Sequence, residues 1–255
     1  MTSSCKISPD FLAGPPPALR KSKINFASAG LPEYTNAYAV LLDGVLTKEE
    51  CNQLLTAAEA TTNGTWERAM INVGGGQQAL AEGTRKCGRI ILDDYELMAK
   101  VWARIEPAVP EIHRLEDWPD VTGPATQDRV WVLTRLNERA RFLKYVGGEY
   151  FKAHYDGMYE TPIGTERSYF TLHLYLNDTV GNDGQILLEG GATSFYSWDM
   201  DHSLYIEPKC GRVLLFQQRD LLHSGDDVTK GTKYTMRTDV MYSLENGLGQ
   251  GPDGG

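Results

Sequence analysis

The sequence of 255 residues has no long hydrophobic run, and it contains few cysteines and histidines. No stretch approaches the roughly 18 consecutive apolar residues of a membrane span, so we expect no membrane partner. Residues 1–23 also lack the apolar segment of a secretory signal peptide. The cysteines are far apart and match neither a zinc-binding pattern nor a dense disulfide framework: Cys5, Cys51, Cys87 and Cys210. These absences predict a cytoplasmic protein with reduced thiols.

Basic residues are also scarce relative to acidic ones. The chain has 25 Lys and Arg against 34 Asp and Glu, which gives a net charge of −9. Binding to nucleic acid through its phosphates requires clusters of Lys and Arg, so we expect no nucleic-acid partner. The remaining composition, with 41% hydrophobic residues, is ordinary for a globular protein, and it indicates no particular oligomeric state.

Three regions differ in composition. Residues 1–35 are rich in Pro, Ser and charge and are predicted to form a flexible N-terminal arm, and residues 246–255 a flexible C-terminal tail. Residues 36–245 are predicted to form one domain. It begins with a short apolar run, followed by Thr47 and Glu50 at the spacing of a helical capping box. A second helix is expected in the segment LDDYELMAKVWARIEPAVP, where apolar residues recur at helical spacing.

From about Arg129 onward the pattern changes to short strands. Segments with alternating or continuous apolar residues are separated by Gly, Asn and Asp turns: RVWVLTRL, ARFLKYV, SYFTLHLYL, GQILLEGGATSFYS, HSLYIEP, GRVLLFQQ and KYTMRTDVMY. This many closely spaced strands favours a sandwich or barrel over βαβ units. The predicted fold class is α+β, mainly β, namely a double-stranded β-helix (jelly roll) with supporting helices on its N-terminal side.

The segment YFKAHYDGMYE contains a candidate pair of metal ligands, His154 and Asp156. On an extended strand, residues i and i+2 lie on one face about 6.5 Å apart, so both side chains can converge on one cation. An imidazole and a carboxylate suit a metal such as Fe(II), and a third ligand would leave coordination positions open for substrate chemistry. Taken alone the pair is a weak signal, because most His-x-Asp pairs are solvated surface residues.

The candidates for the third ligand are His113, His173, His202 and His223, of which His223 is preferred. It follows the apolar strand RVLLFQQ and opens a turn, so it can face the mouth of a barrel. By contrast, His113 lies in the helical half of the chain, and His202 lies in a polar turn with no strand before it.

Two cations on the final strand, Lys233 and Arg237, would share one face if that strand is regular. A cation that faces the interior of a barrel is costly unless it meets an anion, and an anionic cosubstrate would supply one. The alternative is that both side chains lie on the outer face and are solvated. Arg85 and Arg89, which follow a glycine-rich loop, are further candidates for the barrel entrance, although a solvated basic loop would look the same.

Several ordered segments together resemble the Fe(II)- and 2-oxoglutarate-dependent oxygenases, in particular the prolyl 4-hydroxylase-like branch. The segments are YVGGEYFKAHYDG, RSYFTLHLYLND, GGATSFYS, EPKCGRVLLFQ and LLHSGDDVTKGTKY. Their order and spacing hold over roughly residues 40–243. The resemblance implies that the iron ligands are His154, Asp156 and His223.

The resemblance also implies the site of 2-oxoglutarate. Lys233 matches the basic residue that pairs with its distal carboxylate, and the other matching positions line its pocket: Tyr145, Tyr175 and Thr171. Arg237 matches less closely and is a candidate either for the cosubstrate or for an acidic group on the substrate. The expected cofactors are Fe(II), 2-oxoglutarate and O2, with ascorbate as a candidate reductant.

The implied function is hydroxylation, or another oxidation, of an unactivated C–H bond with decarboxylation of 2-oxoglutarate to succinate. The substrate would be a small amino-acid-like metabolite or a prolyl peptide. The tyrosine after Lys233 replaces the tryptophan usual in prolyl hydroxylases, so the sequence does not choose between them. Two alternatives remain: a non-catalytic jelly-roll module that binds a metal or another ligand, and a cupin-type metalloenzyme that does not use 2-oxoglutarate.

Overall fold

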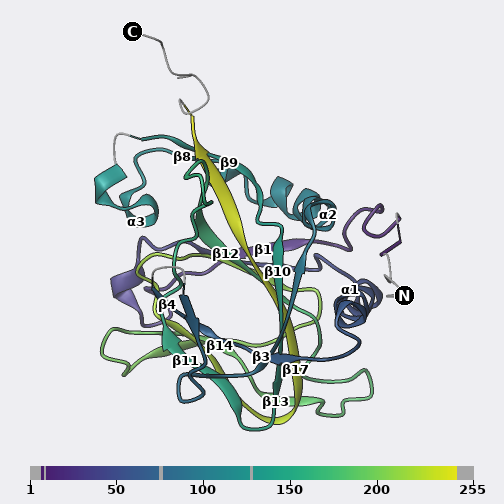
Figure 1. The fold of residues 1–255 in the computed structure, drawn as a ribbon. Helices are drawn as coiled ribbons and strands as arrows, with labels where there is room; N and C mark the ends of the chain where they lie inside the picture. The colour runs from purple at the N-terminus through teal and green to yellow at the C-terminus, as the bar shows by residue number, and fades with distance from the viewer. Residues whose placement is uncertain (1–6, 9, 75–76, 127–128, 246–255) are drawn as a thin grey trace.

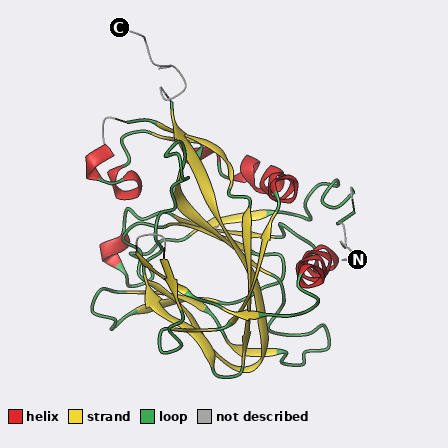
Figure 2. Ribbon diagram, in the orientation of Figure 1, coloured by secondary structure: helices red, strands yellow, loops and turns green. Residues whose placement is uncertain are grey.

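The protein is described here from a computed structural model, which covers residues 7–8, 10–74, 77–126 and 129–245. Strands dominate the fold, and helices lie at its periphery (Figures 1 and 2). The helices are α1 (Lys48–Thr61), α2 (Tyr95–Ile105) and α3 (Pro119–Thr122), with short 3-10 turns at Pro32–Tyr34, Glu106–Ala108, Pro110–Ile112 and Pro124–Thr126. The strands are β1 (Arg20–Lys23), β2 (Ala39–Asp43), β3 (Glu67–Arg68), β4 (Ile71–Gly74), β5 (Gln77–Ala79), β6 (Arg85–Lys86), β7 (Gly88–Asp93), β8 (Arg114–Leu115), β9 (Trp131–Leu136), β10 (Arg139–Val146), β11 (Glu149–His154), β12 (Arg167–Tyr175), β13 (Leu188–Gly190), β14 (Thr193–Tyr196), β15 (Ser203–Ile206), β16 (Val213–Gln217) and β17 (His223–Leu244).

The 22-residue strand β17 joins two sheets that face each other. Its C-terminal part lies in the larger sheet, whose order is β1-β2-β16-β12-β17-β10-β7-β3. Its N-terminal part pairs with β11, β13 and β14 of the smaller sheet, to which β6 and β15 are added at the edges. Every strand pairing is antiparallel, as the jelly roll predicted from the turn pattern requires.

Helices α1 and α2 cover the outer face of the larger sheet. Thr47 and Glu50 form the predicted capping box, in which the Thr47 hydroxyl accepts from the Glu50 backbone and the Glu50 carboxylate accepts from the Thr47 backbone. Asp94 caps α2 in a similar way. Because side chains alternate along a strand, outward residues such as Phe142 and Met236 pack in the main core with the helices, while their neighbours point inward. The helices therefore fix the sheet without entering its interior.

The prediction of a flexible arm over residues 1–35 is wrong for its second half. Strand β1 pairs in register with β2 at the edge of the larger sheet. Phe26 is 1% exposed and Leu31 is fully buried, both in a second core cluster that also contains Tyr34. The composition suggested disorder, but these three large apolar side chains pack the segment against the sheet. The predicted C-terminal tail, residues 246–255, lies outside the described residues.

The described cysteines Cys51, Cys87 and Cys210 are free thiols, and Cys5 lies outside the described residues. None of the helices in the described ranges is both long enough and apolar enough to span a membrane.

Candidate metal centre

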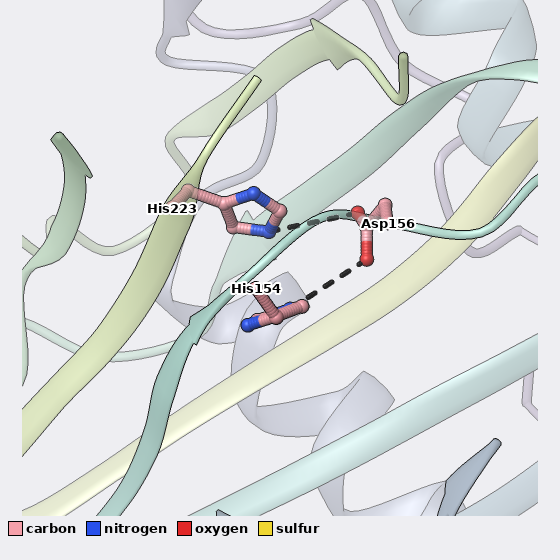
Figure 3. Close-up of side chains that lie close together, drawn as sticks. All are labelled: His154, Asp156 and His223. Carbon is pink, nitrogen blue, oxygen red and sulfur yellow. Dashed lines mark ion pairs between the residues drawn. The ribbon is translucent and has the colours of Figure 1, made fainter. Parts of the chain in front are cut away.

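Strand pairing brings the three predicted metal ligands together. His154 is the last residue of β11 and lies directly opposite His223, the first residue of β17. Asp156 follows two residues after the end of β11, and its carboxylate points back between the two imidazoles (Figure 3). The Nε2 atoms of His154 and His223 each lie 3.7 Å from an oxygen of Asp156. One ligand atom from each residue lies within 4.8 Å of the other two, which is close enough to surround a single ion.

Both imidazoles are held so that Nε2 faces the centre of this cluster. Nδ1 of His154 contacts the carbonyl oxygen of Lys152 at 2.7 Å, and Nδ1 of His223 contacts that of Leu221 at 3.0 Å. A carbonyl can only accept, so each Nδ1 carries the proton and each Nε2 presents a lone pair. Burial lowers the pKa of His154 to about 3 and also lowers that of His223, so both rings are neutral at neutral pH. Neutral imidazoles are the form that binds a metal.

Asp156 is ionised although it is buried. Burial raises the pKa of its carboxyl group, but the positive charge of Arg237 and, to a smaller extent, the hydrogen bond from Thr171 help to hold that pKa well below its usual range. Arg237 Nη2 lies 3.0 Å from Asp156 Oδ1, and the Thr171 hydroxyl donates to Oδ2 at 2.6 Å. Two neutral imidazoles and one carboxylate form the donor set that suits Fe(II), so the residues present fit this metal.

Lys233 lies in the same cavity and has no anionic partner. Its side chain is only 1% exposed, and its Nζ lies 5.2 Å from the ring centroid of Tyr145 and 5.9 Å from that of Tyr175. Within the described part of the chain, no carboxylate lies within ion-pair distance of it. Burial lowers the pKa of Lys233 to about 8, because the charged ammonium is removed from water. A buried cation of this kind indicates a site for an anion.

His173 adds a second unsatisfied polar group to the cavity. Its ring lies 4.9 Å from that of Tyr175, and its Nε2 is buried with no hydrogen-bond partner among the described residues. Buried polar groups are nearly always hydrogen-bonded, so an unpaired one that lines a cavity is consistent with a polar ligand there.

Arg237, in contrast to Lys233, is already neutralised by protein carboxylates. Besides Asp156, it contacts Asp239 Oδ1 at 3.4 Å. Asp239 in turn accepts from Arg141 at 3.1 Å and from Gln218 at 3.1 Å, which forms a buried polar network next to the metal ligands. Asp239, Arg141 and Gln218 were not predicted as site residues from the sequence. A signal existed only for Asp239, which shares a strand face with Arg237.

All of the predicted site residues lie in or beside this one cavity. Its lining includes seven of them: Tyr145, His154, Asp156, Thr171, His223, Lys233 and Arg237. The eighth, Tyr175, lies just behind the lining, where its hydroxyl donates to Thr193 at 2.7 Å. Arg85 lines the cavity too, whereas Arg89 is paired with Glu67 at 2.8 Å.

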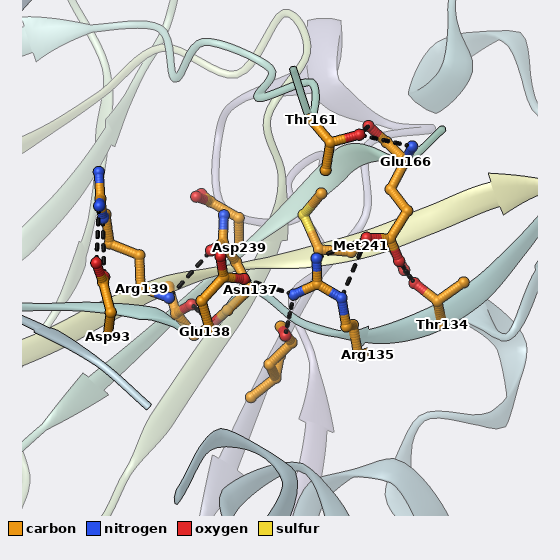
Figure 4. Close-up of polar contacts among 12 residues, drawn as sticks. Asp93, Thr134, Arg135, Asn137, Glu138, Arg139, Thr161, Glu166, Asp239 and Met241 are labelled. Atoms are coloured by element: carbon orange, nitrogen blue, oxygen red, sulfur yellow. Dashed lines mark hydrogen bonds and ion pairs between the residues drawn. The ribbon is translucent and has the colours of Figure 1, made fainter. Parts of the chain in front are cut away.

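A second pocket opens onto Asp156 from the outside. Its volume is about 720 Å³, and Ser168, Tyr169 and Gln218 form part of its inner wall. The loop that leads from Asp156 to β12 forms one side of it and is fixed by a polar network (Figure 4). In that network Glu166, at the end of the loop, accepts from Arg135 at 2.6 Å and from Thr134 at 2.6 Å.

Comparisons with known proteins agree with this arrangement. Residues 140–238 match the family model described as the 2OG-Fe(II) oxygenase superfamily, and that range contains the three candidate metal ligands. A search of the curated proteins found no match.

Solved structures of similar fold include a prolyl-4-hydroxylase from Pseudomonas putida, with a TM-score of 0.53 and 13% identity over 84% of this chain and 97% of that one. A prolyl hydroxylase from Trichoplax adhaerens, solved with a peptide fragment of the hypoxia inducible factor oxygen degradation domain, gives a TM-score of 0.53 and 14% identity over 89% of this chain and 94% of that one. At these identities the similarity establishes the jelly-roll fold alone. Over residues 140–238 the chain thus matches the 2OG-Fe(II) oxygenase superfamily, and its fold is similar to that of prolyl hydroxylases.

Proposed function

We propose that His154, Asp156 and His223 bind Fe(II). The observation that carries this proposal is the convergence of their three ligand atoms within 4.8 Å, with both Nδ1 atoms held by backbone carbonyls. When bound, Fe(II) with 2-oxoglutarate and O2 supplies oxidative decarboxylation to succinate coupled to oxidation of a C–H bond. The protein itself orients the reactants and excludes water.

Lys233 is the proposed anchor for the far carboxylate of 2-oxoglutarate. Both Lys233 and Arg237 face the interior, as the regular strand predicted, but only Lys233 is without a protein carboxylate. Tyr145 and Tyr175 flank the ammonium group and would line the cosubstrate, together with Thr171. The free space in this cavity is about 40 Å³, less than a five-carbon dicarboxylate occupies, so we expect the lining side chains to shift when it binds.

The outer pocket next to Asp156 is the proposed substrate site. Its volume of about 720 Å³ falls within the range of small-molecule sites, and it is open to the surface, so it can receive either a small metabolite or one residue of a peptide. We infer hydroxylation of an amino-acid-like metabolite or of a prolyl peptide. The peptide is supported by the similarity in fold to prolyl hydroxylases, one of which was solved with a peptide.

An anaerobic titration with Fe(II) and 2-oxoglutarate tests the proposal before any substrate is known. Chelation of the metal by 2-oxoglutarate is expected to give a visible charge-transfer band in the wild-type protein and none in the His154→Ala variant. Succinate release is then measured with free amino acids and with proline-containing peptides, and release that depends on Fe(II) and on the added compound identifies the substrate. A wild-type protein that binds both ligands without the band, or a His154→Ala variant that keeps it, would contradict the assignment.

A further inference from the structure

Arg85 is a buried cation that the metal centre and the proposed lysine anchor leave unexplained. It lies in β6, opposite Phe151 of β11, and is 8% exposed. Its guanidinium carbon lies 4.5 Å from the centroid of the Phe151 ring, and that ring stacks on His154 with centroids 3.6 Å apart. Arg85 therefore lines the central cavity, with the Phe151 ring between its guanidinium and the metal ligand His154.

The polar contacts of Arg85, which also include the side chain of Tyr145, do not neutralise its charge. Nε donates to the Cys87 sulfur at 3.4 Å and Nη1 to the Met70 carbonyl at 3.5 Å, and both contacts are long. Among the described residues, no carboxylate lies within ion-pair distance of its guanidinium. By contrast, Arg89 on β7, the next strand along the chain, is neutralised by a close ion pair with Glu67.

The charges that line the cavity are unbalanced. Arg85, Lys233 and Arg237 are cationic, whereas Asp156 is the one carboxylate of the lining. Arg237 is paired with both Asp156 and Asp239. The charge of Arg85 is close enough to affect the pKa of Arg237. Burial lowers the pKa of Arg237, the two carboxylates raise it, and Arg85 opposes them, with a net upward shift. Lys233 is assigned to one carboxylate of the cosubstrate, so Arg85 remains without an anion.

We propose that Arg85 binds a carboxylate in the central cavity, beside the Phe151 ring, in addition to the carboxylate held by Lys233. A buried guanidinium without an anion destabilises the fold, and its planar fork matches a carboxylate. Two molecules can supply this group: 2-oxoglutarate, through its second carboxylate, or a substrate that carries a carboxylate. The inference rests on the proposed function, because it assumes that 2-oxoglutarate occupies the cavity beside Lys233.

The first experiment measures the affinity of the Mn(II)-loaded protein for 2-oxoglutarate by calorimetry, without substrate. The variants are Arg85→Gln, Arg85→Lys and, as a matched control on the same short strand, Lys86→Gln. If Arg85 holds the cosubstrate, Arg85→Gln weakens binding about 10- to 100-fold, the range for one hydrogen bond to a charged group. Arg85→Lys, which keeps the charge, recovers part of the loss, and Lys86→Gln binds as the wild type does.

The second experiment tests the substrate as the source of the carboxylate. With 2-oxoglutarate saturating, L-proline and L-prolinamide are titrated into the wild type and Arg85→Gln. If the wild type binds L-proline more tightly than L-prolinamide and Arg85→Gln does not, Arg85 binds the carboxylate of the substrate.

Two outcomes separate this inference from the proposed function. If Arg85→Gln matches the wild type for 2-oxoglutarate, and the wild type does not distinguish proline from its amide, the role of Arg85 is refuted while the metal and Lys233 assignments stand. If the wild type binds no 2-oxoglutarate at all, the proposed function fails as well.

Discussion

Replacement of Lys233 by methionine is predicted to stabilise the ligand-free protein and to abolish tight binding of 2-oxoglutarate. Burial lowers the pKa of Lys233 from 10.5 to about 8. A difference of that size corresponds to about 3 kcal/mol by which burial disfavours the charged form. The contacts of the ammonium group with the rings of Tyr145 and Tyr175 offset this by stabilising the charged form by about 0.5–2 kcal/mol. Methionine fills a similar volume without charge, so the free energy of unfolding at pH 7 is expected to rise by about 1–3 kcal/mol.

The pH dependence of stability has a definite sign. In the unfolded chain the lysine keeps its proton up to about pH 10.5, whereas in the folded protein it loses it near pH 8. Between these values the unfolded state binds more protons, so this residue makes the wild-type protein more stable as the pH rises from 8 to 10.5. Lys233→Met lacks that contribution, so the gap in stability between variant and wild type should narrow over the same interval.

Binding of the cosubstrate is expected to change in the opposite direction. Loss of one partner of a buried charge pair weakens binding by about 2–5 kcal/mol, which is at least about 30-fold in affinity. Urea denaturation at pH 7 and pH 10 measures stability, and calorimetric titration of the Mn(II) form measures affinity. A variant that is less stable than the wild type and binds 2-oxoglutarate with unchanged affinity would show that Lys233 is a structural residue.

Three further predictions follow from the fold and the metal centre. His154→Ala or Asp156→Ala should abolish Fe(II)-dependent turnover while the circular dichroism spectrum stays native, and full activity in either variant would reject the metal site. Phe26→Ala should lower the free energy of unfolding by about 3–5 kcal/mol, as measured by urea denaturation, because the residue is 1% exposed. An unchanged free energy of unfolding would show that this segment does not pack against the sheet. Gly211→Ala should prevent stable expression or lower the melting temperature strongly. The backbone φ of Gly211 is +73°, and the new Cβ would lie 1.9 Å from the Leu46 carbonyl oxygen. A melting temperature equal to that of the wild type would contradict this close approach.

Local patterns predicted helices α1 and α2, strand β2 and most of the strands from β9 onward, but not the short strands β3 to β8. The capping box at Thr47 and the periodic apolar residues of α2 depend only on neighbours in the sequence, and both are present. Strand β1 was missed because all four of its residues are exposed, so it carries no apolar pattern. It is held by backbone pairing with β2 and by buried residues that follow it, Phe26 among them. Such pairing has no signature in the sequence of the strand itself.

The metal ligands could be identified from sequence, but their geometry could not. The expectation that His154 and Asp156 share an extended strand holds only in part, because β11 ends at His154. The convergence depends instead on the register between β11 and β17, which places His154 opposite His223. Register between strands distant in the chain is set by packing of the whole sheet, so no short segment contains it.

The charges in the cavity show most clearly what the sequence omits. Lys233 and Arg237 look equivalent in the sequence, because both face inward from one strand. They differ because Arg237 meets carboxylates from β17 itself and from the segment after β11, whereas Lys233 meets two aromatic rings. Arg85 and Arg89 likewise look equivalent in the sequence, and they differ because β6 pairs with β11, which ends at His154, whereas Arg89 is paired with Glu67. Strand pairing therefore decides which cations are paired with protein carboxylates and which remain unpaired. The unpaired cations are the ones to which we assign anion sites.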